Sequence, residues 1–373
     1  MVNGAAIKDR LVAQAAQLGC AAVGVTRAGP VGDHPRFRDW LARDWAADMG
    51  YLRKHADPRA DPRHVLDSAR SVIVIAVPYP AADPGPKGAP GRVAGLFAGR
   101  DYHPVVREVL AELAKTLDVA ETATRAFVDT GPVLERSLAV AAGLGTIGHH
   151  TQLLVPGHGA RVALGVLVTE RELEPDPPFT RDLCGDCRAC LQACPTTALH
   201  LGLGLDARRC LSYWTTANRQ PIPRPLRPLV GNRLYGCDSC QVCCPHDPSA
   251  HTPASPHPEL CGDPTHSLDA LHRLLTLGRR PLARALGHSG LGWIGRTALL
   301  RTVCVVLGNH GHADNVAPLT AAMQDRDPII ATHAAWALGQ MQTPEAHAAL
   351  ELAASRTSIH ELQQEIQLAL TPQ

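Results

Sequence analysis

Apolar and polar positions alternate along the first 170 or so residues with two periods, one typical of helices and one typical of strands. The apolar positions near the N-terminus are Ile7, Leu11, Val12, Ala15 and Leu18. Their helical spacing predicts an amphipathic helix. Three apolar runs, at 71–80, 124–129 and 161–170, are typical of strands. The helical segment and the strand-like runs together predict an α/β domain over residues 1–173.

The pattern changes after residue 173. Residues 174–250 are rich in cysteine, and 251–373 read mainly as helices after a proline-rich connector. Two stretches in this last part, "VCVVLGNHGHADNVAPLTAAM" and "AAWALGQMQTPEAHAALELAA", superpose with a shift of 31 residues that matches Leu307 to Leu338. Each reads as helix, turn, helix, which favours a HEAT-like repeat. An ordinary pair of helical hairpins is the alternative.

Charge and length narrow the class of protein. The chain has 373 residues and a net charge of +1, so its bulk charge favours neither nucleic acid nor a membrane surface. No apolar run reaches the roughly 18 residues of a membrane span. The N-terminal pattern is amphipathic and differs from a signal peptide. We therefore expect a cytoplasmic protein without a membrane partner.

The cysteines are concentrated in one region. Of the twelve in the chain, nine lie from Cys184 to Cys244. In a reducing compartment such a cluster indicates metal or redox chemistry instead of disulfides. Cys20 and Cys304 lie in apolar helical surroundings, where we expect small core residues.

Two cysteine runs each end on Cys-Pro: "CGDCRACLQACP" at 184–195 and "CDSCQVCCP" at 237–245. Such runs are typical of a ferredoxin-like domain with paired 4Fe–4S clusters, in which the last cysteine of each run binds the other cluster. The expected ligands of cluster one are Cys184, Cys187, Cys190 and Cys244. The expected ligands of cluster two are Cys194, Cys210, Cys237 and Cys240. Structural zinc in four-thiolate sites is the alternative, and Cys243 is the alternative to Cys244.

An acid stands at the end of a predicted strand in "FVDTGPVLERS" (127–137). Asp129 would face a ligand crevice if the strand's carboxyl end opens on one, as in parallel sheets. Burial against a large flat cofactor would raise its pKa and make it a proton donor. The alternative is an aspartate that only caps the following helix.

Four stretches carry a resemblance that covers nearly the whole chain: "FAGRDYH", "VDTGPVLERSLAVAAGLGTIGHHT", "DARRCLSYW" and "GNRLYGCDSCQVCCP". They resemble the epoxyqueuosine reductase family. The resemblance implies cobalamin and two 4Fe–4S clusters as cofactors. It also implies reduction of epoxyqueuosine to queuosine at the wobble position of tRNA, the last step of queuosine biosynthesis, with Asp129 as proton donor.

The same resemblance implies which positions surround the cobalamin. They are Arg59, Ala94, Asp129, Leu153, Leu164, Ser212, Ser239 and Cys240. The chain departs from the family pattern at Thr146 and His149, where members often have an aromatic residue and a lysine. Two rival functions are a reductive dehalogenase-like oxidoreductase and a non-enzymatic tRNA- or protein-binding scaffold with structural zinc.

Arginines predict a tRNA surface. Residues 206–236 contain six arginines and one acid, and residues 270–313 contain six arginines and no acid. Arginine binds phosphate bidentately, so we expect Arg219 and Arg233, nearest the cysteine runs, to contact tRNA. Tyr213 and Trp214 are candidates for stacking an extruded base. A general preference for arginine over lysine is the alternative.

The expected partners follow from this function. They are tRNA carrying epoxyqueuosine in its anticodon loop and an electron donor such as a flavodoxin or ferredoxin system. We expect the protein to act as a monomer.

Overall fold

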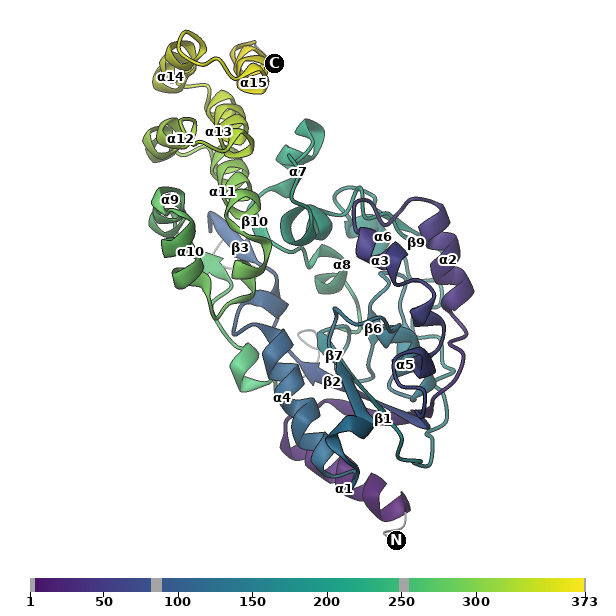
Figure 1. Ribbon diagram of the computed structural model, residues 1–373. Helices are drawn as coiled ribbons and strands as arrows, with labels where there is room; N and C mark the ends of the chain where they lie inside the picture. The colour runs from purple at the N-terminus through teal and green to yellow at the C-terminus, as the bar shows by residue number, and fades with distance from the viewer. Residues whose placement is uncertain (1–3, 82–88, 248–254, 372–373) are drawn as a thin grey trace. The chain divides into compact units, whose positions relative to one another are not determined.

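The computed structural model describes residues 4–81, 89–247 and 255–371, and groups the chain into two compact units (Figure 1). The first, which we call the sheet unit, comprises Met1–Ala81, Gly99–Arg209 and Asp238–Gly262. The second, the repeat unit, comprises Ala82–Ala98, Cys210–Cys237 and Asp263–Gln373. Each unit gathers segments that are far apart in sequence. The predicted division at residues 173 and 250 stays a prediction. The sequence of residues 81–91, rich in proline and glycine, predicts a flexible loop, most of which lies outside the described residues.

A four-stranded sheet forms the centre of the sheet unit. Its order is β1 (Ala22–Arg27), β2 (Ser71–Pro78), β7 (Val162–Thr169) and β4 (Thr124–Phe127). The three predicted strands are present, but every pairing is antiparallel. A ligand crevice at the shared carboxyl ends of parallel strands therefore does not apply here.

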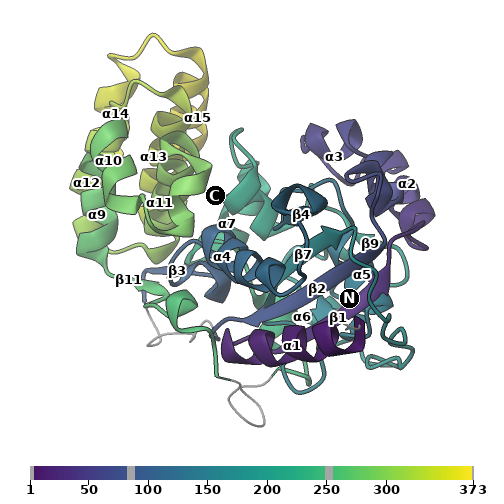
Figure 2. The ribbon, with the colours of Figure 1, turned by 60° about the horizontal axis from the view of Figure 1, so that its bottom comes forward.

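Helices cover both faces of this sheet, which is why all eight residues of β2 are buried. On one face, α4 (Tyr102–Lys115) packs against Gly165, where a Cβ atom would lie 2.7 Å from Val106. On the other face, α5 (Glu135–Ala141) contributes Leu138 to an apolar cluster with β2 and β7. Figure 2 shows the sheet with these helices.

The N-terminal helix α1 (Gly4–Gln17) is present as predicted and contacts α4 and β1. Ile7, Leu11 and Ala15 are buried. Val12 is 47% exposed, so it lies off the apolar stripe that the sequence pattern assigned to it.

Short elements complete the sheet unit. They are α2 (His34–Ala42), α3 (Gly50–Lys54), β5 (Thr146–Ile147), β6 (Leu153–Leu154), α6 (Ala189–Ala193), β8 (Leu199–His200), β9 (Gly204–Leu205) and α8 (Ser239–Val242). The β5–β6 hairpin and the two helices α6 and α8 carry residues of the candidate site.

The repeat unit combines a small sheet with stacked helices. The sheet has the order β10 (Arg233–Tyr235), β3 (Gly91–Val93) and β11 (Thr265–His266). The helices are α7 (Arg227–Val230), α9 (Leu268–Thr276), α10 (Arg279–Leu286), α11 (Arg296–His310), α12 (Val316–Ala322), α13 (Pro328–Met341), α14 (Pro344–Ala354) and α15 (His360–Leu370). Helices α11, α13 and α15 form one row, and α9, α12 and α14 form a second row (Figure 1).

The two glycines matched by the repeat have the same physical role. A Cβ atom on Gly308 of α11 would lie 2.7 Å from the Cα atom of Ala337 in α13. A Cβ atom on Gly339 of α13 would lie 2.9 Å from the Cα atom of Ala369 in α15. Each glycine thus lets one helix approach the backbone of the next. The predicted repeat is confirmed by this geometry, and Cys304 is fully buried among these helices, as expected.

Among the helices that the structure describes, none has both the length and the apolar character to cross a membrane.

Candidate functional site

Asp129 lies in a strained turn directly after β4. Its φ angle is +58°, a left-handed conformation that is uncommon for residues other than glycine. Its backbone N–H donates to Oε1 of Glu135 over 2.6 Å, which fixes the turn to the start of α5. The carboxyl group itself is 63% exposed. Such a conformation, held by its neighbours and presenting an acid to solvent, is typical of functional sites.

His103 connects Asp129 to a second acid. Nδ1 of His103 lies 2.7 Å from Oδ1 of Asp101, and Nε2 lies 3.6 Å from Oδ2 of Asp129. Asp101 is the N-cap of α4 and also accepts the backbone N–H of His103. The imidazole is 7% exposed, so its orientation is fixed. We call this set the Asp–His–Asp chain.

The Asp–His–Asp chain shifts the pKa values of His103 and Asp129. Burial alone would lower the pKa of His103, but its hydrogen bond with Asp101 and its attraction to Asp129 outweigh burial and raise the pKa to about 9. Partial burial would raise the pKa of Asp129, but the attraction of protonated His103 outweighs it, and the pKa lies below its ordinary value. The raised pKa expected for Asp129 applies to burial against a bound cofactor and stays a prediction. Without a cofactor, the imidazolium of His103, which the sequence did not reveal, keeps the pKa of Asp129 below its ordinary value.

Glu135 is a further acid at the same turn. Burial, and next the negative charge of Asp129, raise its pKa to about 7. Tyr102 hydrogen-bonds with Asp129 and stacks on His103 with ring centroids 4.1 Å apart. Two proton-holding groups, His103 and Glu135, thus lie beside Asp129.

Predicted cobalamin-contacting residues of the sheet unit partly gather at this turn. Arg59 is buried and donates to the carbonyl oxygen of Gly131, two residues beyond Asp129, over 3.1 Å. Leu164 of β7 is half-buried and pairs with Ala76 of β2. A guanidinium, a partly exposed apolar side chain and a proton source fit one edge of a large ligand with apolar and polar groups.

The other predicted cobalamin positions are distributed over the two units. The side chain of Leu153 is only 2% exposed and packs inside the apolar cluster of the sheet unit. Ser239 and Cys240 begin α8 in the same unit. Ala94 and Ser212 belong to the repeat unit. Their roles toward cobalamin stay predictions.

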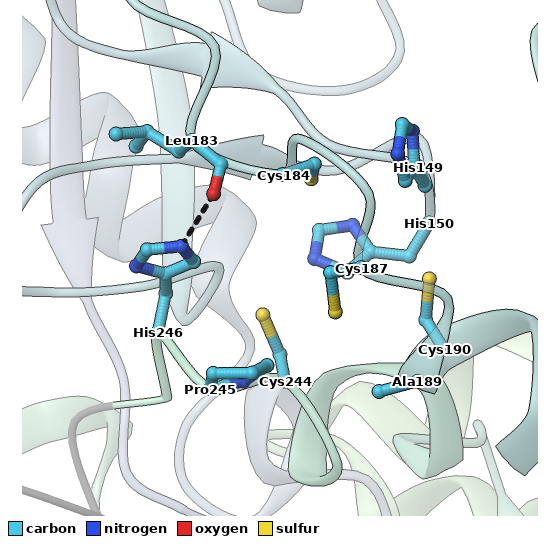
Figure 3. A pocket seen from close by; sticks show the side chains of 10 residues that line it. All are labelled: His149, His150, Leu183, Cys184, Cys187, Ala189, Cys190, Cys244, Pro245 and His246. Atoms are coloured by element: carbon cyan, nitrogen blue, oxygen red, sulfur yellow. Dashed lines mark hydrogen bonds between the residues drawn. The ribbon is translucent and has the colours of Figure 1, made fainter.

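Four cysteines of the sheet unit line one pocket (Figure 3). They are Cys184, Cys187, Cys190 and Cys244, together with His149, His150, Leu183, Ala189, Pro245 and His246. Cys190 lies on α6, and Cys244 follows α8, which packs against α6. Cys243 is not among the lining residues. The pocket therefore gathers the four cysteines predicted for cluster one, and it favours Cys244 over Cys243.

The cysteines of this pocket favour the protonated thiol when no metal is bound. Burial raises the pKa of Cys190 to about 11. The Nε2 atom of His246 lies 2.7 Å from the carbonyl oxygen of Leu183, which ties the second cysteine run to the first (Figure 3). Binding of iron would displace the thiol protons.

The four cysteines predicted for cluster two occur in both units. Cys194 and Cys240 are in the sheet unit, and Cys210 and Cys237 are in the repeat unit. Cys194 is absent from the pocket of Figure 3, and its sulfur accepts the backbone N–H of Ala198 over 3.2 Å. This ligand set stays a prediction.

The arginines predicted to bind tRNA differ in their surroundings. Arg219 donates to the carbonyl oxygens of Trp293 and Ile294. Arg233 donates to the carbonyl oxygen of Val230 at the end of α7. Carbonyl oxygens carry no full charge, so these contacts do not themselves neutralise either guanidinium group.

Other members of the arginine-rich segments are structural. Arg301 is fully buried and donates to the carbonyl oxygens of Trp214 and Asn218. Arg227 is buried beside Glu365. Tyr213 is also buried, and its hydroxyl accepts from Asn218, which argues against its predicted stacking on a base.

Sequence reasoning missed Asp101, His103, Glu135 and His150. One signal was present: "RDYH" places an aspartate at a helix N-cap two residues before a histidine, a spacing at which the carboxylate can orient the imidazole. Nothing in the sequence placed that histidine beside Asp129.

Comparisons with known proteins agree with these features. Residues 183–247 match the family model of the 4Fe–4S double cluster binding domain. Residues 59–130 match the model "Epoxyqueuosine reductase QueG, DUF1730", and residues 295–371 match HEAT repeats. The 4Fe–4S match supports iron–sulfur clusters over structural zinc.

Relatives match over nearly the full chain. The epoxyqueuosine reductase of Bacillus subtilis is 32% identical, over 97% of this chain and 94% of its own. That of Escherichia coli K12 is 32% identical, over 87% and 86%. A crystal structure of epoxyqueuosine reductase with an epoxyqueuosine-modified tRNA-Tyr stem loop has a TM-score of 0.88 and 31% identity, with 99% of each chain covered. The acid at the strained turn, the paired cysteine runs and the repeat helices therefore occur together in an oxidoreductase that belongs to the epoxyqueuosine reductase family.

Proposed function

We propose that this protein reduces epoxyqueuosine in tRNA to queuosine, with cobalamin and two 4Fe–4S clusters as cofactors. The observation that carries the proposal is the Asp–His–Asp chain, which presents Asp129 on an exposed turn with a protonated histidine behind it. The four cysteines around one pocket support the electron path, and the similar structure with a modified tRNA stem loop supports the substrate.

The reaction requires two electrons and two protons. An epoxide oxygen bridges two carbons, and its removal as water leaves a carbon–carbon double bond. Both protons must reach the leaving oxygen, and the acids at the Asp129 turn are placed to supply them. Cobalamin, when bound, supplies a low-valent cobalt that is strongly nucleophilic, and the clusters deliver electrons one at a time.

Asp129 would deliver the first proton. Its lowered pKa makes it an anion in the cofactor-free protein, so it must first take a proton, and His103 lies 3.6 Å away with its pKa raised to about 9. Proton transfer from His103 to Asp129 leaves a neutral imidazole that Asp101 keeps oriented. Binding of substrate and cobalamin over the exposed carboxyl would remove water and raise the pKa of Asp129, which favours this transfer.

Glu135 is placed to supply the second proton. Its pKa of about 7 leaves a substantial protonated fraction near neutral pH. Its Oε1 atom accepts the backbone N–H of Asp129, so both acids lie at the same turn.

Cofactor and substrate contacts complete the proposal. Cobalamin would contact Arg59, Ala94, Asp129, Leu153, Leu164, Ser212, Ser239 and Cys240. Cluster one would use Cys184, Cys187, Cys190 and Cys244, and cluster two Cys194, Cys210, Cys237 and Cys240. Arg219 and Arg233 would contact tRNA. The protein would act as a cytoplasmic monomer supplied by a flavodoxin or ferredoxin system.

The test is a single-turnover assay with anaerobically reconstituted protein, cobalamin, a strong chemical reductant and an epoxyqueuosine-containing anticodon stem loop. Mass spectrometry of the digested RNA should show queuosine. A zinc-containing scaffold would show no conversion and no iron–sulfur absorption. A dehalogenase-like enzyme would reduce an aryl halide and leave the modified RNA unchanged.

A further inference from the structure

His150 has a buried hydrogen-bond donor without a partner among the described residues. The side chain is 2% exposed, and its Nε2 atom has no hydrogen-bond partner in the described part of the chain. Its Nδ1 atom accepts the backbone N–H of Gln152 over 3.1 Å. A backbone N–H can only donate, so Nδ1 carries the lone pair and Nε2 carries the proton. Buried donors are normally satisfied, and an exception needs an explanation.

The ring is held in place by a tight turn. His150 lies in the loop between β5 and β6, where the N–H of Gly148 donates to Gln152 and the N–H of Thr151 donates to Gly148. Gly148 lacks a side chain where the imidazole lies, since a Cβ atom there would be 3.0 Å from Cε1 of His150. The imidazole therefore has little freedom to turn its donor elsewhere.

The ring faces the cysteine pocket. His150 lines the same pocket as Cys184, Cys187, Cys190 and Cys244, and Figure 3 shows its ring projecting into the space between the cysteine side chains. All of these residues belong to the sheet unit. The neighbouring ring of His149 differs, because its Nε2 atom lies 3.2 Å from the carbonyl oxygen of Gly185 and 3.3 Å from Arg188.

We infer that His150 donates a hydrogen bond from Nε2 to a sulfur of cluster one and thereby raises the reduction potential of that cluster. The inference rests on the proposed use of this pocket by a 4Fe–4S cluster. A reduced cluster carries more negative charge than an oxidised one, so an N–H donor stabilises the reduced form more. His150 is a tuning residue for electron transfer, and the bond explains its otherwise unpaired donor.

The test compares two substitutions in the full-length, anaerobically reconstituted protein. His150→Leu fills the space without a donor, and His150→Gln keeps a donor. Redox titration followed by electron paramagnetic resonance should show that one cluster of His150→Leu is reduced only at more negative potential. His150→Gln should stay closer to the unmodified protein. His158→Leu is the matched control, since His158 is half-buried and does not line the pocket.

Two further measurements separate the inference from the proposed function. Iron and sulfide content should stay at about eight each per chain in both His150 variants. Cys184→Ser should alter the signal that shifts in His150→Leu, which assigns that signal to cluster one. If Cys184→Ser leaves both clusters intact, the proposed ligand set fails and the inference fails with it.

If the cluster is present but His150→Leu titrates at the unmodified potential, the inference alone is overturned. The same holds if His150→Gln shifts as far as His150→Leu, because packing would then explain the effect. Pulsed resonance of the reduced protein in deuterated buffer gives an independent check. An exchangeable deuteron coupled to cluster one should be present in the unmodified protein and absent in His150→Leu.

Discussion

Nε2 of His103 lies 3.6 Å from Oδ2 of Asp129, and the other ring nitrogen of His103 is held by Asp101. The proposed proton donor is therefore paired with a histidine that is charged at neutral pH. An isolated aspartate would need burial to hold a proton, whereas Asp129 can take one from its neighbour.

Asp129→Asn should abolish proton delivery while keeping the turn, since asparagine tolerates a left-handed conformation. We expect queuosine formation to fall by about two to four orders of magnitude, the usual contribution of a positioned general acid. Cobalamin and cluster content should stay unchanged, as judged by absorption. Asp118→Asn is a matched control, because Asp118 also has a positive φ angle but pairs with Arg10. Near-normal turnover in Asp129→Asn would show that this aspartate only shapes the turn.

The raised pKa of His103 predicts a pH dependence of stability. Protonated His103 contributes stability fully below its ordinary pKa of 6.5, and the contribution is lost as the pH rises through about 9. The cofactor-free protein should lose at most about 1.4 kcal/mol per pH unit from this group within that window. His103→Gln should flatten the decline in thermal unfolding midpoints measured across it. An unchanged slope in the variant would contradict the raised pKa.

Cys184→Ser should remove cluster one and Cys194→Ser should damage cluster two, each leaving the other cluster largely intact. Unmodified anaerobic protein should contain about eight iron and eight sulfide per chain. Cys243→Ser is the control, because Cys243 does not line the pocket that Cys244 lines. Loss of a cluster in Cys243→Ser would show that the fourth ligand is the other cysteine of the pair.

Gly308→Ala should destabilise the repeat unit. The added Cβ atom would lie 2.7 Å from the Cα atom of Ala337, so α11 and α13 must separate. We expect a loss of about 1 to 3 kcal/mol in the free energy of unfolding, typical of overpacking. Gly278→Ala is the control, since the nearest atom to its Cβ would be 3.9 Å away. Equal stabilities of the two variants by thermal scanning would show that the helices can adjust.

Arg219→Ala and Arg233→Ala should each weaken binding of the tRNA stem loop. Loss of one phosphate contact should reduce the slope of log affinity against log salt by about one unit. Arg356→Ala, at an exposed arginine of the repeat unit, is the control. A full salt series in which both variants bind like the unmodified protein would place the RNA elsewhere.

Much of this protein could be predicted from local spacing. Three of the four strands of the central sheet, the N-terminal helix and the repeat helices follow from periodicity, because burial of one face requires apolar residues at regular intervals. The cysteine runs indicated iron–sulfur clusters, since most ligands of such a cluster lie close together in sequence. Asp129 was found in the same way, from its place after a strand.

Tertiary structure decided what depends on residues distant in sequence. The antiparallel order of the sheet, the imidazole of His103 beside Asp129 and the burial of Arg301 are long-range contacts with no local signal. The pKa of Asp129 lies below its ordinary value for this reason, since a pKa depends on the charges around a group in space. His150, whose Nε2 donor has no partner in the described part of the chain, likewise faces the cysteine pocket because folding brings the β5–β6 turn there. Sequence thus determined which chemical groups this protein has, and folding determined which of them act on one another.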